Sequence, residues 1–351
     1  GGIYGVGEGQ NTLLVDANML NRADFISHPS AGTTVFNVFN SEEGVYDNVI
    51  FDAVNQYIVT PIATYAFYYC KSVKRIKFPK RLEYVDDAAF NGCSNLQEID
   101  LSSWTDGKMQ GNSPFAFDNI FNHVPASGRI IVPEQTEADA FFMMSGTGLS
   151  EDWFTFKPDV KDDEENNCKY YIDPISNEKV FAGIYDLTKL GKEYIIPKDY
   201  AKIAPRAIYN VFRRGLYYGS LEKIAFEEGS QVKKICFNAF ALNDYIKEVD
   251  LSACNQLVCI DVAAFYSMGG LIKVTFPKDA PFSSLGAFAF SNNGAMTTAD
   301  ISQTKIKKIG VAAFNNCVKL ETLNLAPTTE MISAGAIAGN TKLTSITISS
   351  S

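Results

Sequence analysis

The sequence has few of the residues on which catalytic and metal sites usually depend. Only two histidines, His28 and His123, occur in 351 residues. The chain contains no G-x-S-x-G, H-E-x-x-H or G-x-x-x-x-G-K-S/T motif, which are signatures of hydrolases, zinc proteases and nucleotide-binding loops. We therefore predict that the protein is not an enzyme and expect no catalytic residues, no metal and no cofactor.

Positive charge and long apolar runs are also scarce. The formal net charge is −9, whereas proteins that bind nucleic acid carry basic surfaces. No apolar run approaches the ~18 residues that span a bilayer. We expect neither nucleic-acid binding nor a membrane span. No signal peptide is visible at the start, and GGIYGVGEGQ reads as a trimmed, flexible beginning. We expect that an export signal or a lipid anchor has been removed from it.

What the sequence does contain is an internal repeat. The pattern apolar-x-x-apolar-x-apolar occurs eight times, and in the second half its copies start 23 to 25 residues apart. The copies are VKRIKF from Val73, LQEIDL from Leu96, LEKIAF from Leu221, IKEVDL from Ile246, LIKVTF from Leu271, MTTADI from Met296, LETLNL from Leu320 and LTSITI from Leu343. A regular period of 20–50 residues is the signature of a repeat architecture.

A second motif lies between these copies. An apolar residue is followed, five positions later, by the Phe or Ile of an Ala-Phe or Ala-Ile pair. The pairs are Ile62 with Phe67, Val85 with Phe90, Ile203 with Ile208, Ile235 with Phe240, Ile260 with Phe265, Leu285 with Phe290, Ile309 with Phe314, and Ile332 with Ile337.

Both motifs predict a stacked coil. The last two apolar positions of the first motif alternate, so they share one face of a short strand. Stacking such strands at ~4.8 Å gives a parallel ladder with a continuous core. We expect each Phe to stack on the Phe of the next coil, with the preceding Ala kept small by a tight turn. The period falls within the 20–29 residues of leucine-rich repeats.

The segments AFYYCKSVKRIKFP and AFNGCSNLQEIDL closely resemble the repeat unit of the BspA-like, or Treponema-type, leucine-rich-repeat family. That unit reads L-x-x-I-x-L-P, then V-x-x-I, then A-F-x-x-C. The resemblance covers roughly residues 60–105 and 200–351. It implies an α/β, strand-rich leucine-rich-repeat solenoid, with a parallel β ladder in two blocks. It also implies a surface or secreted bacterial protein that functions in binding or adhesion.

The pattern divides the chain into four parts. Residues 1–55 are expected to form an irregular lead-in or cap, with VFNVF and NVIFDAV as degenerate first coils. Residues 56–157 form the first block, with an Ala-Phe at Phe117, a helix over 137–144 and an aromatic cap around Trp153. Residues 158–177 are an acidic linker or loop without the spacing of a calcium loop. Residues 178–351 form the second block.

The seven cysteines do not suggest a disulfide framework, because their number is odd. Cys70, Cys93 and Cys317 each lie three positions after the Phe of an Ala-Phe pair. The spacing of Cys254 and Cys259 is too irregular for a zinc knuckle. These cysteines could have a redox or metal-binding role. The simpler interpretation is that each is a small buried side chain that fills the turn. We predict that the cysteines are buried and reduced.

Two sets of residues are candidates for binding a partner. The long segment NVFRRGLYYGS carries residues of the types enriched at binding hot spots. They are Tyr209, Arg213, Arg214, Tyr217 and Tyr218. The second set is an outward-facing column of the repeat, formed by Asp250, Thr275, Asp300 and Asn324. Both sets have simpler explanations. The tyrosines could pack over an irregular turn, and the polar residues of the column could serve only to keep the protein soluble.

Three further tyrosines, Tyr65, Tyr68 and Tyr69, flank the first Ala-Phe pair. The partner we expect is a protein, on a host or another surface. The alternative is a glycan that stacks on exposed tyrosines. We expect a monomer whose polar final strand, residues 343–351, frays at its end instead of pairing with another chain.

Overall fold

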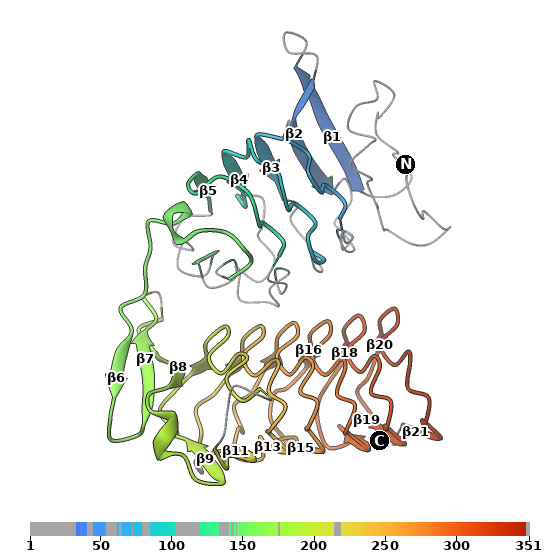
Figure 1. The fold of residues 1–351 in the computed structure, drawn as a ribbon. Helices are drawn as coiled ribbons and strands as arrows, with labels where there is room; N and C mark the ends of the chain where they lie inside the picture. Colours follow the sequence, from blue (N-terminus) through green and yellow to red (C-terminus); the bar gives the residue numbers. More distant parts are fainter. Residues whose placement is uncertain are drawn as a thin grey trace. The chain divides into compact units, whose positions relative to one another are not determined.

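The computed structural model describes two compact units, Gly1–Lys157 and Pro158–Ser351 (Figure 1). The described residues are 33–40, 45–53, 62, 65–71, 73–78, 85–102, 115, 119–132, 140–141, 144, 146–174, 176–213 and 219–348. Residues 33–40 and 45–53 are described as backbone only.

Unit 1 is built on one five-stranded sheet in the order β1-β2-β3-β4-β5. Its strands are β1 (Thr33–Asn40), β2 (Val45–Ala53), β3 (Arg75–Lys77), β4 (Glu98–Asp100) and β5 (Arg129–Ile131). The last four are parallel, whereas β1 and β2 pair antiparallel. VFNVF and NVIFDAV are therefore not two successive coils. The connection between β1 and β2 is too short for the crossover that parallel neighbours need.

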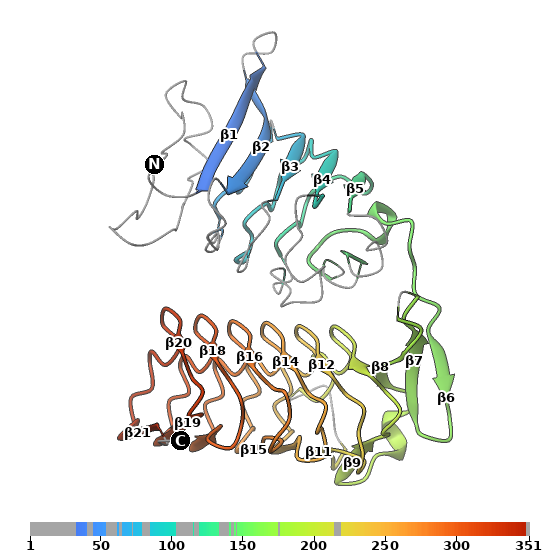
Figure 2. The ribbon, with the colours of Figure 1, turned by 180° about the vertical axis from the view of Figure 1, so that it is seen from behind.

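Unit 2 has two rows of strands on opposite sides (Figure 2). One row is a nine-stranded sheet, in the order β20-β18-β16-β14-β12-β10-β8-β7-β6. It contains β6 (Lys161–Asp163), β7 (Cys168–Ile172), β8 (Lys179–Ile184), β10 (Lys202–Ile203), β12 (Lys234–Ile235), β14 (Cys259–Ile260), β16 (Ser284–Leu285), β18 (Lys308–Ile309) and β20 (Met331–Ile332).

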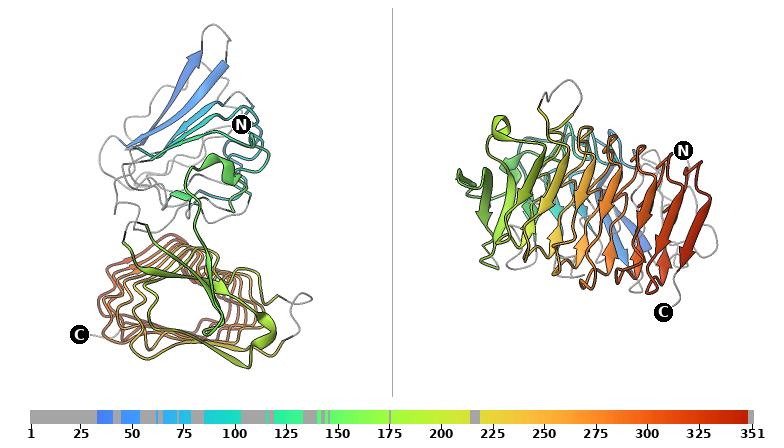
Figure 3. Two further views of the ribbon diagram at one scale, coloured as in Figure 1. Left: turned by 90° about the vertical axis from the view of Figure 1, so that its left-hand side faces the viewer. Right: turned by 90° about the horizontal axis from the view of Figure 1, so that it is seen from below.

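The second row of unit 2 consists of two sheets seen side by side in Figure 3. The first has β9 (Glu193–Ile196), β11 (Lys223–Phe226), β13 (Glu248–Asp250) and β15 (Lys273–Thr275). The second has β17 (Thr298–Asp300), β19 (Thr322–Leu325) and β21 (Ser345–Ile348). Of the short 3₁₀ helices, η4 (Glu151–Trp153) belongs to unit 1, and η5 (Leu187–Lys189) lies in unit 2 between β8 and β9.

The repeat prediction is confirmed. All eight copies of the first motif form strands that pair in parallel with the strand of a neighbouring coil. The apolar residues of the second motif form the other ladder, in which Ile203, Ile235, Ile260, Leu285, Ile309 and Ile332 are in register. Each coil therefore contributes one strand to each side, and a strand-rich solenoid results, with little helix in the described residues.

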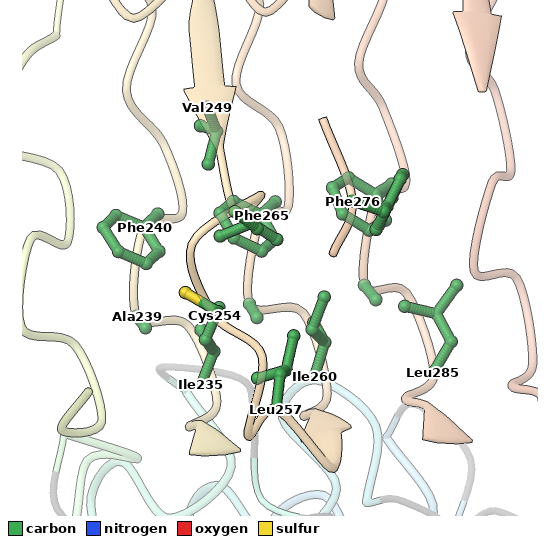
Figure 4. Close-up of a cluster of buried hydrophobic side chains, with 14 of the residues drawn as sticks. Ile235, Ala239, Phe240, Val249, Cys254, Leu257, Ile260, Phe265, Phe276 and Leu285 are labelled. Carbon is green, nitrogen blue, oxygen red and sulfur yellow. The ribbon is translucent and has the colours of Figure 1, made fainter. Parts of the chain in front are cut away.

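The core is a stack of aromatic rings between the two ladders. Phe240 and Phe265 lie 5.0 Å apart and nearly parallel, and Phe265 and Phe290 are 4.9 Å apart. Figure 4 shows Phe240 and Phe265 in one row and Ile235, Ile260 and Leu285 in another. In unit 1, Phe67 and Phe90 repeat the contact at 4.9 Å. The expected Phe stacking is therefore present in both units, where parallel strands impose a spacing near ~4.8 Å.

The Ala-Phe turn has a conformation that the sequence did not reveal. In eight coils, the residues two before and two after the Phe or Ile both have positive φ. These pairs are Tyr65 and Tyr69, Ala88 and Gly92, Arg206 and Asn210, Asn238 and Leu242, Ala263 and Ser267, Phe288 and Asn292, Ala312 and Asn316, and Gly335 and Gly339. Most of their amides donate to the next coil, as Ala263 does to Ala287 and Ser267 to Ser291. These bonds hold a conformation that costs a non-glycine residue roughly 1–2 kcal/mol.

The cysteine column is also a hydrogen-bonding column. Asn243, Asn293 and Asn340 occupy the same position, three after the Phe or Ile. The amide of Asn293 donates to the carbonyls of Phe265 and Phe290 and accepts from Met268 N. Cys317 donates from its Sγ to the carbonyl of Phe290 over 3.1 Å. The thiol thus replaces one of the hydrogen bonds that asparagine makes at this position. The cysteine therefore does more than fill the turn with a small side chain.

All seven cysteines are buried and none forms a disulfide. Burial raises the pKa of Cys317 to about 11 and the pKa of Cys254 and Cys259 to about 12. Thiols with such pKa values stay protonated and are poor nucleophiles and metal ligands.

The last coil of unit 1 ends in a cluster of aromatic side chains. Ala140, Phe141 and Met144 lie in helical conformation, within the expected helix. Phe141 packs against Phe154 at 5.2 Å, and the indole of Trp153 donates to the carbonyl of Pro125 over 2.8 Å.

The Phe column of this coil was misassigned from the sequence. Phe121 stacks on Phe90 at 5.6 Å, and Phe90 N donates to Ile120 O. Ile120 and Phe121 therefore take the place assigned to the Ala-Phe pair that ends at Phe117, which itself lies outside the described residues. The turn of this coil starts later in the sequence than the repeat spacing indicates.

Residues 158–177, expected as an acidic linker or loop, contain paired β structure. β6 and β7 form an antiparallel hairpin, and β7 pairs with β8 at the edge of the nine-stranded sheet. One of the acidic side chains stabilises the turn of the hairpin, because Asp163 accepts hydrogen bonds from the backbone and side chain of Asn166. The strand β7 gives no clean alternating signal, because a bulge between Lys169 and Tyr170 buries Cys168 and Tyr171 and leaves Ile172 exposed.

Candidate functional site

Of the five predicted site residues in the segment NVFRRGLYYGS, the structure describes two, Tyr209 and Arg213. Tyr209 is half-buried, and the guanidinium of Arg206 lies 5.2 Å from its ring centre. Arg213 is exposed. Arg214, Tyr217 and Tyr218 lie outside the described residues. The first tyrosine of this predicted set is therefore covered by a cation of the chain itself.

The predicted column Asp250, Thr275, Asp300 and Asn324 falls into two groups. Asp250 is in register with Thr275, and Asp300 with Asn324, but β15 and β17 belong to different sheets. The two aspartates have a structural role as well. Asp250 accepts a hydrogen bond from Ser252 N and Asp300 from Ser302 N, both over 3.0 Å, as in an Asx turn.

The pKa of Asp250 reflects this local role. Burial opposes ionisation of the carboxyl, but hydrogen bonds from Ser252 and the nearby charges of Lys223 and Lys273 outweigh it and lower the pKa. At neutral pH the group is an anion whose charge is largely compensated within the ladder.

A ladder of alternating charges runs across the same face. Its members, in strand order, are Glu193, Lys223, Glu248 and Lys273. Lys223 lies 3.0 Å from Glu193, and Lys273 lies 3.1 Å from Glu248. Ile195 is exposed on this face, with 51% of its surface accessible, and Ile272, the residue directly before β15, is 48% exposed beside it. The face therefore offers apolar contacts between charges that are already paired.

The lysines of the nine-stranded sheet are neutralised in the same way. Lys234 lies 3.3 Å from the buried carboxylate of Asp261, and Lys307 lies 3.3 Å from Glu330. Lys233 pairs with Glu178. Burial works against the charge of Lys234, but Asp261 prevails and raises its pKa. These lysines do not form an uncompensated basic patch.

The tyrosines of unit 1 form a cluster on the surface. Tyr65, Tyr68 and Tyr69 are 56%, 42% and 49% exposed. The ring centres of Tyr65 and Tyr68 are 5.1 Å apart, and those of Tyr68 and Tyr69 are 4.6 Å apart, both edge to face. We call these three residues the tyrosine cluster. The sequence drew attention to them but gave no geometry, because their contacts follow from the unusual turn.

The described residues contain no group of three His, Cys, Asp or Glu side chains placed to hold a metal ion. Within the same part of the chain, no helix is long and apolar enough to cross a membrane.

Two parallel ladders, a Phe stack and an Asn/Cys column define a leucine-rich-repeat protein. The family model described as BspA type leucine-rich repeat region matches six copies, over residues 50–127, 179–284 and 233–351. The chain belongs to this BspA-type family, as its repeat unit suggested. No curated protein matches the chain.

Several solved structures are similar. A leucine-rich cell surface protein from Faecalibacterium prausnitzii is 17% identical, covering 90% of this chain and 82% of its own, with a TM-score of 0.36. The T. pallidum leucine-rich-repeat protein is 17% identical, over 52% of this chain and 91% of its own, with a TM-score of 0.35. The pneumococcal vaccine antigen PcpA is 14% identical, over 91% and 84%, with a TM-score of 0.37.

Proposed function

We propose that the protein is a non-catalytic recognition protein, secreted by a bacterium or displayed on its surface, that binds other proteins in recognition or adhesion. The observation that supports this most is the outer face of β9, β11, β13 and β15. It is regular, its charges are paired, it exposes Ile195, and Ile272 is exposed beside it, directly before β15.

The size and chemistry of this face fit a protein partner. Strands stacked at ~4.8 Å extend the row that includes β17, β19 and β21 to about 30 Å, which is the scale of a standard interface of ~800 Å² per partner. Aliphatic side chains supply apolar contacts of the kind that such interfaces bury, and ion-paired side chains supply polar ones. Paired charges also disfavour strong attraction to nucleic acid. We propose a monomeric scaffold for this role.

The test uses intact cells as the binding target. The labelled chain is applied to cells before and after protease treatment, with periodate-oxidised cells as the control for glycans. We expect binding that is sensitive to protease, resistant to periodate and weakened at least tenfold in Ile272→Asp. Ile172→Asp is the matched control, since Ile172 is 40% exposed on β7, outside this face. Binding that survives protease, or that Ile272→Asp leaves unchanged, would contradict the proposal.

A further inference from the structure

The two units expose different kinds of apolar side chain. Among the described residues, the large hydrophobic side chains exposed on unit 1 are Tyr65, Tyr68 and Tyr69. Those exposed on unit 2 are aliphatic residues and Met331. Aliphatic side chains suit a protein interface, whereas aromatic rings beside polar groups suit a sugar, because a ring face can pack against C–H groups while hydroxyls find hydrogen bonds.

The backbone fixes the tyrosine cluster in place. Tyr65 and Tyr69 have φ of 60° and 55°, and their amides donate to the carbonyls of Asp87 and Asn91 in the next coil. The ring of Tyr69 rests on Gly92, where an added Cβ would lie 2.7 Å from the ring. One face of this ring is therefore supported by backbone, and the residue remains 49% exposed although the ammonium of Lys71 lies 6.0 Å from the ring centre. Such support lowers the entropy cost of binding.

Polar groups continue the cluster along the solenoid. Asn91 Oδ1 lies 3.1 Å from Nδ1 of the exposed His123, one coil further on. Within the described part of the chain, none of the three tyrosine hydroxyls forms a hydrogen bond. The equivalent position in unit 2 differs: the hydroxyl of Tyr266 accepts from Asn292, whose Oδ1 in turn accepts from Asn316. The hydroxyl of Tyr266 is thus engaged, whereas the hydroxyls of the tyrosine cluster are available to a ligand.

We propose that the tyrosine cluster, together with Asn91 and His123, is a binding site for a neutral oligosaccharide. The ring of Tyr69 packs against a sugar ring, and the amide and imidazole groups bind hydroxyls. Three rings offer far less area than the ~800 Å² that a protein partner needs, but enough for one or two sugar units. This site lies in unit 1 and does not depend on the proposed function of unit 2.

The experiment screens the chain against an array of neutral oligosaccharides built from glucose, galactose, mannose or N-acetylhexosamine, and titrates the best of them calorimetrically. We expect Tyr69→Ala to weaken binding about tenfold, or about 1.4 kcal/mol, because it removes the ring against which the sugar packs. Tyr69→Phe keeps the ring and should bind within twofold of the parent. Tyr266→Ala is the matched control for Tyr68→Ala, since both follow the Phe of their turn.

Three outcomes would overturn this site. The first is that no neutral oligosaccharide on the array binds. The second is that Tyr69→Ala and Tyr68→Ala bind as well as the parent while circular dichroism shows them folded. The third is that a protein probe, and no glycan, loses affinity in Tyr69→Ala, which would assign the cluster to protein recognition.

Discussion

Asn293 Nδ2 donates a hydrogen bond to the carbonyl of Phe265, 28 residues earlier, over 3.0 Å. The same amide group also donates to Phe290 O, and the side-chain oxygen accepts from Met268 N. One fully buried side chain thus serves backbone groups of two coils. Asn243 and Asn340 make the same set of contacts in their own coils.

Asn293→Ala is therefore expected to destabilise unit 2 by about 2–4 kcal/mol, because it leaves buried backbone groups without partners. Asn293→Cys should cost less, since Cys317 makes the equivalent bond to Phe290 O. Urea denaturation followed by circular dichroism measures both. Equal losses for the two variants would show that the cysteines of this column do not replace asparagine.

Because φ is positive at some alanines of the turn and not at their neighbours, replacement by glycine should change the stability of the protein differently at the two positions. Ala263 has φ of 51° and Ala264 does not have positive φ, yet both are buried. Replacing either with Gly loses a methyl group worth about 0.8 kcal/mol. Both replacements also add chain entropy to the unfolded state, but only Ala263→Gly relieves a left-handed conformation.

We expect Ala263→Gly to be close to neutral and at least about 1 kcal/mol more stable than Ala264→Gly. Thermal melts of the two variants and of the pair Ala312→Gly and Ala313→Gly test the same difference twice. Melting temperatures that fall equally within each pair would refute the role of φ.

The buried thiols predict a loss of stability at alkaline pH. The pKa of Cys317 is raised from 9.0 to about 11 by burial. Its contribution to stability is fully present below pH 9, and it is lost as the pH rises toward 11, because the unfolded chain releases the proton first. The slope for one thiol is about 1.4 kcal/mol per pH unit over that range.

Cys317→Asn removes this thiol and keeps a side chain that the column accepts. Its unfolding free energy should fall less steeply between pH 9 and 11 than that of the parent chain. Urea titrations at four pH values provide the measurement. Parallel slopes for the two proteins would mean that Cys317 ionises equally in both states.

The charge ladder predicts a salt-dependent effect. Glu248→Lys places like charges on three adjacent strands, beside Lys223 and Lys273, and should destabilise unit 2 by about 1 kcal/mol at low salt. The loss should shrink in 1 M NaCl, where the screening length is about 3 Å. Glu248→Gln is the control and should cost less. A loss that does not respond to salt would indicate a packing defect instead.

The sequence predicted the features that every coil shares, and it missed features that occur in only one place in the chain. Apolar spacing located all eight strands and the Phe stack, because every coil must bury the same positions. It did not reveal the hairpins β1–β2 and β6–β7, since a strand pattern does not state the direction of its neighbour. The positive-φ positions were hidden because Tyr65, Ala88, Arg206 and Leu242 are not turn formers by type.

The site could be predicted only in part for a related reason. Residue type drew attention to the tyrosines, but the edge-to-face contact of Tyr68 and Tyr69 depends on a turn set by hydrogen bonds to another coil. The same holds for Asp250 and Asp300. The repeat spacing predicted that they lie in one column, but it did not predict the Asx turns that their carboxylates form. Whether either set binds a partner stays a prediction, as does fraying of the final strand.

The separation of β15 from β17 has a mechanical consequence. On one side of unit 2 the strands divide into two sheets here, while the nine-stranded sheet on the opposite side continues past this point. No strand-pairing hydrogen bond spans this gap in the described residues, so we expect the coils from β17 onward to resist bending less on this side than on the side of the continuous sheet. A row of strands that can change its curvature in this way can fit partners of different radius with the same side chains.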